Sequence, residues 1–385
     1  MAERTVIQWD KDDLESLGLL KVDVLALGML TAIRKALNLI EQHHQKRYEL
    51  YQITRAMDDQ AVYADLQKAD SVGVFQIESR AQMSMLPRLK PASYYDLVIQ
   101  IAIVRPGPIQ GGMVHPYLKR RDGEQGVSYP SEDVRSILER TLGVPIFQEQ
   151  VIQLAMVAAG FSGGEADQLR RAMASWKKSG KLMQFKHKLI NGMLERGYTQ
   201  SFAEQLFAQI CGFGEYGFPE SHSASFALLA YASAWLKHYY PQAFYCALLN
   251  SLPMGFYSPS QLVQDAVRHG HTVLPVCVNR SLYDYTLEPY SGSWAIRLGL
   301  RQVKGLAPQA AEVLINKRGA GFISLQTLKT CGLNSQTLQA LASADALTTL
   351  AGNRYQSRWE LMKRTPETAK PLQQTLQSAA PLGNS

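Results

Sequence analysis

The sequence predicts a mainly helical protein with a small part that mixes helices and strands. Helical periodicity runs from residue 131 to about residue 250, where apolar residues recur three and four positions apart. Beyond His269, three short segments bounded by prolines and glycines have the pattern of strands. These segments are 272–279, 283–288 and 294–300. Helical patterns return at 308–317 and 335–341.

The composition limits the class of protein. The chain has 385 residues, 40 Lys and Arg against 33 Asp and Glu, a net charge of +7 and 46% hydrophobic residues. This length gives two or three domains with a real core, and the apolar fraction excludes disorder throughout. No apolar run approaches the ~18 residues of a membrane span, and the first residues lack the pattern of a signal or transit peptide. We therefore expect a soluble cytoplasmic protein with no membrane partner.

The four cysteines form no recognisable pair. They are at least 31 residues apart, without the spacing of a metal knuckle or a redox motif. We expect them to be buried thiols in a reducing compartment. They are Cys211, Cys246, Cys277 and Cys331.

Most of the net positive charge of the chain comes from one stretch. Between Glu165 and Arg196, eight basic residues accompany three acidic ones. A solvated helical face explains such a stretch. A surface that binds phosphate explains it equally, because clustered Lys and Arg displace counterions from nucleic acid. Both explanations stay open at this point.

Two serine–glutamate pairs predict helix starts, and one long apolar run predicts a buried helix. Ser162 precedes Glu165, and Ser201 precedes Glu204, with the spacing of a capping box. The run 223–235 is apolar nearly all round, which is typical of a helix buried in a large domain. A proline that opens the next helix should follow its end.

Asp23 stands in an aliphatic segment, 20–27, that has the pattern of a strand or strand end. A carboxylate in such surroundings is costly unless a cation or hydrogen bonds accompany it. A helix cap or a salt bridge to Lys21 would satisfy it. A hard cation such as Mg²⁺, which prefers oxygen ligands, would satisfy it as well.

The segment 212–223 combines three glycines with a Ser-His-Ser sequence at the start of the apolar helix. Glycines let the backbone bend closely around a ligand, and a helix N-terminus offers N–H groups to an anion. The alternative is an ordinary glycine turn with a serine N-cap, in which His222 is a satisfied helix-start histidine. The segment lacks the lysine of a Walker loop.

Three arginines are further candidates for phosphate contact. Arg105 precedes a rigid Pro-Gly-Pro turn, which favours a bidentate contact over a solvated side chain. Arg170 and Arg171 lie in the helix that follows the first capping box, within the basic stretch. Two polar clusters, 76–79 and 148–150, predict capping or network residues when each is taken alone.

Six ordered motifs resemble the bacterial DNA polymerase III alpha subunit family, the C-family DNA polymerases. They are 20–25, 73–79, 105–108, 148–151, 167–173 and 216–223. The resemblance covers residues 5 to about 350. Within the family, 24–29 and 218–223 resemble the error-prone, damage-tolerant branch, because the main replicative branch usually has a lysine where Glu220 stands.

The resemblance implies an architecture. Residues 1–28 would be the C-terminal remnant of a nucleotidyltransferase-like palm, and 29–265 a helical polymerase fingers domain. Residues 266–350 would be a small mixed module with a helix-hairpin-helix. The Pro-, Ser-, Thr- and Gln-rich residues 351–385 are expected to be a disordered tail.

The implied activity is error-prone, template-directed DNA synthesis by two-metal nucleotidyl transfer in the bacterial cytoplasm. The cofactor would be Mg²⁺, and the partners would be primed DNA and deoxynucleoside triphosphates. A sliding clamp and accessory damage-tolerance proteins are further expected partners. No part of this implication follows from composition or periodicity.

Site residues are implied by motif match. Asp23 corresponds to a catalytic palm carboxylate that binds metal, and His222 corresponds to a position beside the nucleotide sugar. The implied nucleotide-binding residues are Lys21, Arg105, Arg170, Arg171, Tyr216, Ser221 and His222. The implied DNA-binding residues are Lys177, Lys178 and Lys181 in the basic stretch, and Lys304 and Gly305 in the hairpin.

The chain departs from the family in length. Members are far longer, and the closely spaced aspartates that anchor both metals are not matched by Asp10, Asp12 or Asp13. Cys277 stands where the family commonly has an aspartate. The chain therefore resembles the C-terminal part of a member, as a truncated product, a split gene or a partial sequence. One hypothesis is a polymerase role, and the other is a non-catalytic fragment that binds DNA or a partner, because one carboxylate cannot fix two Mg²⁺ ions.

Overall fold

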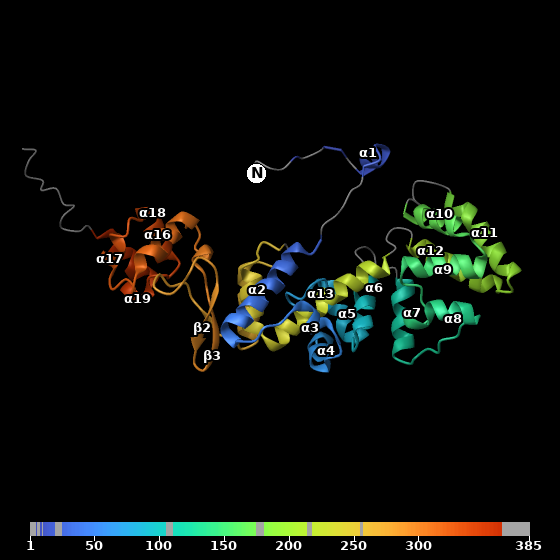
Figure 1. Ribbon diagram of the computed structural model, residues 1–385, viewed down its shortest axis with the longest axis horizontal. Helices are drawn as coiled ribbons and strands as arrows, with labels where there is room; N and C mark the ends of the chain where they lie inside the picture. The colour runs from blue at the N-terminus through green and yellow to red at the C-terminus, as the bar shows by residue number, and fades with distance from the viewer. Residues whose placement is uncertain are drawn as a thin grey trace, which may run out of the picture.

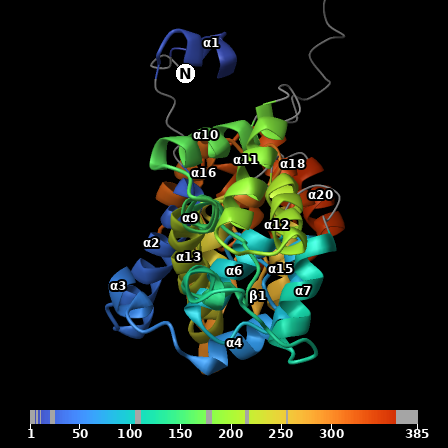
Figure 2. The ribbon, with the colours of Figure 1, turned by 90° about the vertical axis from the view of Figure 1, so that its right-hand side faces the viewer.

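The computed structural model describes residues 5, 8–9, 11–19, 25–104, 111–174, 181–213, 218–254 and 257–363. The protein is mainly helical with one three-stranded sheet, which confirms the predicted fold class. Figure 1 shows an elongated molecule in which three groups of elements follow one another, each with its own hydrophobic core. Figure 2 views the same row from the end at which α9–α12 lie.

The first group surrounds a core that draws on two separate parts of the chain. Its residues come chiefly from 29–118 and from 226–296. Its helices are α2 (Leu27–His44), α3 (Leu50–Thr54), α4 (Gln60–Gln67), α5 (Arg80–Leu89), α6 (Tyr94–Ile103), α7 (Gly111–Arg121), α13 (Glu220–Tyr239), α14 (Pro241–Leu249) and α15 (Pro259–Arg268). The second group is therefore inserted into the sequence of the first.

Helix α13 is the central element of the first group. It packs against α2, α3, α4, α6 and α14, and its buried residues lie on all sides. This confirms the buried helix predicted from the apolar run, and Pro241 opens α14 as expected. The helix begins at Glu220, so Ser221 and His222 lie in its first turn.

The second group packs five helices around a compact core within 134–207. They are α8 (Glu132–Leu138), α9 (Gln148–Ala159), α10 (Gly163–Ala174), α11 (Lys181–Glu195) and α12 (Gln200–Phe213), with a 3-10 turn at Glu139–Thr141. The capping box at Ser162 is confirmed: its N–H donates to Glu165 Oε2 at 3.0 Å, and its Oγ accepts from the Glu165 N–H at 3.4 Å. The one expected at Ser201 is wrong, because α12 begins one residue earlier and Thr199 Oγ1 accepts from the Phe202 N–H.

The third group joins a small sheet to short helices. Strand β3 (Ser293–Arg297) lies between β1 (Val273–Leu274), which is parallel to it, and β2 (Thr286–Tyr290), which is antiparallel. The helical elements are a 3-10 turn at Leu300–Gln302, α16 (Pro308–Arg318), α17 (Leu325–Lys329), α18 (Ser335–Ser343), α19 (Thr348–Ala351) and α20 (Arg354–Met362). Strands β2 and β3 also pack on α14, so the sheet joins the first and third groups.

Two expectations at the chain ends need correction. The tail expected from residue 351 is wrong up to residue 362, because α20 packs on α18 and buries Ser357 to 1% exposure. The remaining residues, 364–385, lie outside the described part. In the described part of 1–28 the regular structure is α1 (Lys11–Ser16) and the start of α2, and no strand. The predicted strand around Asp23 lies outside the described residues.

Two other expectations can be compared with the described residues. Cys246, Cys277 and Cys331 are free and buried, as predicted. Within the described ranges, no helix has the length and apolar character needed to cross a membrane.

Candidate nucleotide-binding and DNA-binding sites

The start of α13 is held against the start of α9. Phe218 forms an isolated parallel bridge with Phe147, and the Gln148 N–H donates to the Phe218 carbonyl oxygen at 3.2 Å. Glu149 Oε2 accepts from the Glu220 N–H at 3.0 Å. This carboxylate satisfies one of the N–H groups that a helix leaves free at its N-terminus. The polar cluster at the start of α9 is therefore a network, as predicted.

Glu220 is the centre of a second contact. The Tyr95 hydroxyl donates to Glu220 Oε1 at 2.9 Å, and the guanidinium of Arg140 lies 3.7 Å from the same oxygen. Arg140 also lies over the Tyr95 ring, 3.9 Å from its centroid. Burial and the bond to Glu220 raise the pKa of the Tyr95 hydroxyl, so it stays a donor. The helix start is thus fixed from α6 as well as from α9.

The ring of His222 is packed between two phenylalanine rings. Its centroid lies 5.1 Å from that of Phe218 and 4.1 Å from that of Phe226. Ser221 is exposed beside it. The serine N-cap of the glycine-turn alternative is not what begins this helix, because Pro219 occupies the N-cap position and offers no side-chain bond.

The other predicted polar cluster lies in a tight turn before α5. Gln76 has a positive φ of 65°, and Ser79 Oγ caps α5 by accepting from the Gln82 N–H at 3.3 Å. Burial raises the pKa of Glu78 from its usual 4.5 to about 7, although hydrogen bonds from Tyr257 and from the Gly73 N–H oppose the shift. These residues therefore act as a helix cap and as members of a hydrogen-bond network, as predicted.

Most residues of the predicted nucleotide site lie outside the described part. Neither backbone nor side chain is described for Lys21, Asp23, Arg105 and Tyr216 of this site, nor for Lys177 and Lys178, which are predicted to bind DNA. The backbones of Arg170 and Arg171 lie in α10 and that of Lys181 opens α11, while their side chains are not described. The described part of the predicted site is therefore the start of α13, with Ser221 and His222. The roles of the other residues stay predictions.

Part of the basic stretch serves packing within the second group. Lys188 forms a salt bridge with Glu165 and, together with the Ser162 capping bonds, lowers the pKa of Glu165 to about 2. Lys186 lies 5.7 Å from the centroid of the Phe207 ring. Arg196 donates to a carbonyl of its own helix. These three basic residues therefore make contacts within the second group, and DNA contact stays a prediction for the others.

The predicted hairpin lies between the 3-10 turn and α16. The Leu306 N–H donates to the Val303 carbonyl at 3.1 Å, and Gly305 has a φ of +86° with no atom within 4 Å of where a Cβ would lie. Lys304 is exposed, and Pro308 opens α16. An exposed turn that leads into a helix presents backbone N–H groups, which are the donors that contact DNA phosphate in such motifs.

A second hairpin, whose glycine has a similar positive φ, was missed in the sequence. Gly332 lies between α17 and α18 with a φ of +90° and equally open surroundings. Asn334 then caps α18, since its Oδ1 accepts from the Thr337 N–H at 2.8 Å. The sequence does contain a signal for this second hairpin. The Gly-Leu pair at 305–306, shortly before a helix start, recurs at 332–333.

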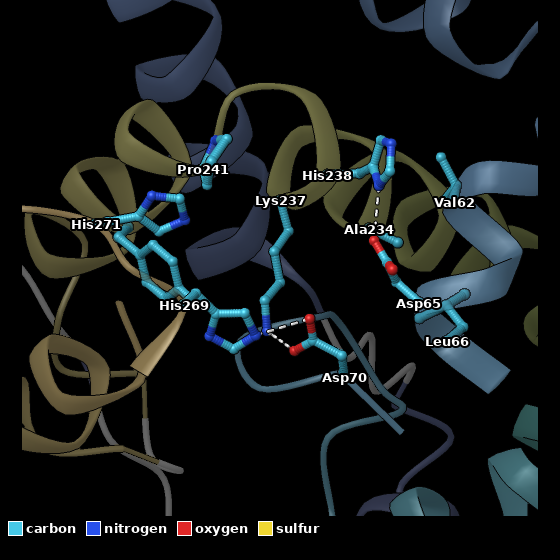
Figure 3. Close-up of a pocket in the computed structure, with 11 residues that line it drawn as sticks. Val62, Asp65, Leu66, Asp70, Ala234, Lys237, His238, Pro241, His269 and His271 are labelled. Carbon is cyan, nitrogen blue, oxygen red and sulfur yellow. Dashed lines mark hydrogen bonds and ion pairs between the residues drawn. The ribbon is translucent and has the colours of Figure 1, made fainter. Parts of the chain in front are cut away.

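A partly buried ionic cluster in the first group was not predicted from the sequence. Oxygen and nitrogen atoms of Asp70, Asp265 and His269 lie within 4.8 Å of one another. The ammonium of Lys237 lies 2.6 Å from Asp70 Oδ1 (Figure 3). It also lies 3.4 Å from Asp265 Oδ2. The Tyr245 hydroxyl donates to Asp265 at 2.6 Å. Asp70, Lys237, Tyr245 and His269 line a pocket of about 160 Å³.

This cluster already contains its cation. Lys237 is 6% exposed, and its ammonium contacts both of the carboxylates that a metal ion would need. Burial opposes ionisation of Asp70, but Lys237 and His269 outweigh it and hold the pKa of Asp70 below its usual value. The cluster therefore does not fit Mg²⁺, which would have to displace a buried ammonium ion.

The chain carries a finger domain like that of the bacterial DNA polymerase III alpha subunit, followed by a helix-hairpin-helix motif. Residues 29–197 match the bacterial DNA polymerase III alpha subunit finger domain, and residues 270–357 match a helix-hairpin-helix motif. The first match covers most of the first two groups up to the end of α11. The second covers the sheet and both hairpins.

Its similar relatives are error-prone DNA polymerases. The chain is 69% identical over 380 residues to the error-prone DNA polymerase of Vibrio vulnificus. This alignment covers 98% of the chain and 37% of the relative. The chain is 62% identical over 371 residues to the error-prone DNA polymerase of Idiomarina loihiensis and 61% identical over 395 aligned positions to that of Methylococcus capsulatus. The chain thus spans a little over one third of the length of these relatives.

Proposed function

We propose that this chain acts in error-prone, template-directed DNA synthesis as the part of the polymerase that holds the incoming nucleotide and the DNA. The supporting observation is its 69% identity to an error-prone DNA polymerase, which runs across the finger domain and the hairpin module together. We also propose that the chain works in the cytoplasm, together with a sliding clamp and accessory damage-tolerance proteins.

The nucleotide would bind at the start of α13. His222 would face the sugar, and Ser221 would lie beside it in the first turn. The triphosphate would be bound by positive charge, because Arg forms bidentate contacts with phosphate. The residues proposed for this contact are Lys21, Arg105, Arg170 and Arg171, and Tyr216 would line the same loop as His222. Mg²⁺, with Asp23 among its ligands, would activate the primer hydroxyl and neutralise the triphosphate.

DNA would be held at two places. The backbone N–H groups of the two hairpins, at Gly305 and Gly332, would contact phosphates of the duplex, with Lys304 adding charge. The basic stretch would contribute Lys177, Lys178 and Lys181. Two glycine hairpins in one module support this part of the proposal.

Binding to primed DNA tests the proposal directly. Fluorescence anisotropy of a labelled primer–template with the 385-residue chain should give an affinity that falls steeply with salt. The change of Arg170 and Arg171 to alanine should flatten the salt dependence by about two units of log–log slope. The next correct deoxynucleotide should tighten the complex more than an incorrect one. Affinity that is independent of salt and nucleotide would contradict the proposal.

We also propose that the 385-residue chain alone binds without extending a primer. One aspartate cannot fix two Mg²⁺ ions, and the ammonium of Lys237 already occupies the described acidic cluster. Primer extension with the chain and with its Asp23→Ala variant separates binding from synthesis. Robust incorporation that is lost in the variant would show that the chain is catalytic by itself.

A further inference from the structure

Four aromatic rings form a continuous ladder that ends at the proposed nucleotide site. The ring of Phe75 meets Phe226 edge to face with centroids 5.0 Å apart, Phe226 meets His222 at 4.1 Å, and His222 meets Phe218 at 5.1 Å. Residues 218, 222 and 226 are four positions apart, so they lie on one face of the helix and its entry. The ladder therefore follows from helix geometry and sequence spacing together.

The ladder is anchored at both ends by the backbone. Phe218 is held by the bridge to Phe147. At the other end, the Phe75 N–H donates to Ser233 Oγ at 3.1 Å. Its turn is tight, because a Cβ on Gly73 would lie 2.6 Å from Leu248 Cδ1. The two terminal rings are thus fixed before any ligand binds.

His222 depends on this ladder for its position. No described residue hydrogen-bonds its ring, which is half-buried, so ring packing decides where the imidazole lies. Phe226 makes the closer contact and is 9% exposed. Removal of its ring would leave an apolar space on that face, into which the imidazole could retreat.

We propose that Phe226 is a positioning residue that holds the His222 imidazole against the nucleotide sugar and so sets the preference for deoxyribonucleoside over ribonucleoside triphosphates. This inference rests on the proposed function, in which His222 faces the sugar. A fixed imidazole leaves no room for a 2′-hydroxyl, whereas a mobile one does. Phe75 supports Phe226 from the far side of the ladder.

Equilibrium nucleotide binding by the 385-residue chain on primed DNA tests the inference. The affinities for the next correct deoxynucleotide and for the corresponding ribonucleotide give a discrimination ratio. Phe226→Leu keeps an apolar side chain but removes the ring, and it should lower the ratio about tenfold, mainly through tighter ribonucleotide binding. In a His222→Ala background the same change should have no further effect, because the ring acts through the imidazole.

The control is Phe207→Leu. Phe207 is 7% exposed in the second core and does not contact the ladder, so it reports the general effect of losing a buried ring. Thermal unfolding of both variants shows whether they lose comparable stability. A fall in the ratio with Phe226→Leu alone supports the inference.

Three results would overturn it. An unchanged ratio in Phe226→Leu, with nucleotide still bound, would reject the positioning role and leave the proposed function standing. An equal fall in Phe207→Leu would show that lost stability is the cause. Failure of the unmodified chain to bind either nucleotide would overturn the proposed function and the inference with it.

Discussion

The ammonium group of Lys237 lies 2.6 Å from the carboxylate of Asp70, which precedes it by 167 residues. Through this contact, α13 is fastened to the turn after α4. Asp265 brings the end of α15 to the same ammonium. The pair therefore ties together segments from both parts of the chain that build the first core.

Lys237→Met should destabilise the protein by about 3–5 kcal/mol, because it leaves the buried carboxylate of Asp265 without its buried cationic partner. Urea unfolding followed by circular dichroism gives the free energy of unfolding. Lys68→Met is the matched control, since Lys68 is 75% exposed and lies 3.9 Å from Asp65. Its cost should stay below about 1 kcal/mol. Equal costs for the two variants would contradict the importance of the buried cluster.

Glu78 should make the protein less stable as the pH rises from about 5 to 8. The folded chain keeps the Glu78 proton up to about pH 7, whereas the unfolded chain loses it near 4.5. Between these values the folded state binds more protons, so the free energy of unfolding falls with pH, by about 2 to 3 kcal/mol in total.

Glu78→Gln should remove this decline and should make the protein more stable than the unmodified chain at pH 8. Urea unfolding at several pH values checks both expectations. Glu195→Gln, at an exposed position, controls for the change in net charge. A Glu78→Gln variant that keeps the original pH dependence would show that another group causes it.

Gly305→Ala and Gly332→Ala should each cost about 1 kcal/mol, because alanine resists a positive φ. Each should also weaken binding of primed DNA, on the order of tenfold, by disturbing a hairpin that contacts phosphate. Gly292→Ala is the matched control: its φ of +78° and open surroundings are the same, but it lies in the turn between β2 and β3. Equal loss of DNA affinity in all three variants would reject the hairpins as the DNA contact.

Glu220→Lys should destabilise the start of α13 by about 1 kcal/mol, since it places like charges together and removes the acceptor for the Tyr95 hydroxyl. Arg140→Glu should restore part of this loss in the double variant. Arg135→Glu should not, because Arg135 pairs with Glu132 and Glu139 instead. A double-mutant cycle in thermal unfolding measures the coupling, and a coupling of zero would contradict the Arg140–Glu220 contact.

Local patterns in the sequence predicted much of the fold. The apolar run 223–235 became the centre of α13, and the segments chosen as strands contain β1 and most of β2 and β3. These successes share a cause, because helix and strand periodicity express burial of one element at a time. The error at Ser201 was one of boundary: Thr199 offers the same cap, and spacing alone does not choose between two hydroxyl residues.

Contacts between distant residues could not be predicted in this way. Nothing near Lys237 in sequence points to Asp70, although a lysine inside an apolar helix signals that some buried partner exists. The ladder around His222 has a clearer sequence pattern, because aromatic residues lie four positions before and four positions after this histidine. Its fourth ring, Phe75, comes from a turn 151 residues before Phe226 in the sequence and has no such trace.

The insertion of the second group into the first has a consequence for how the chain is made. A ribosome delivers residues in order, and the middle core is complete once residue 207 has emerged. The first core contains residues from 29 onward, yet it also needs Leu287 and Ile296. Residues 29–118 must therefore wait for residues 226–296, which are made much later, before the first core can close. The core between them can close in the meantime.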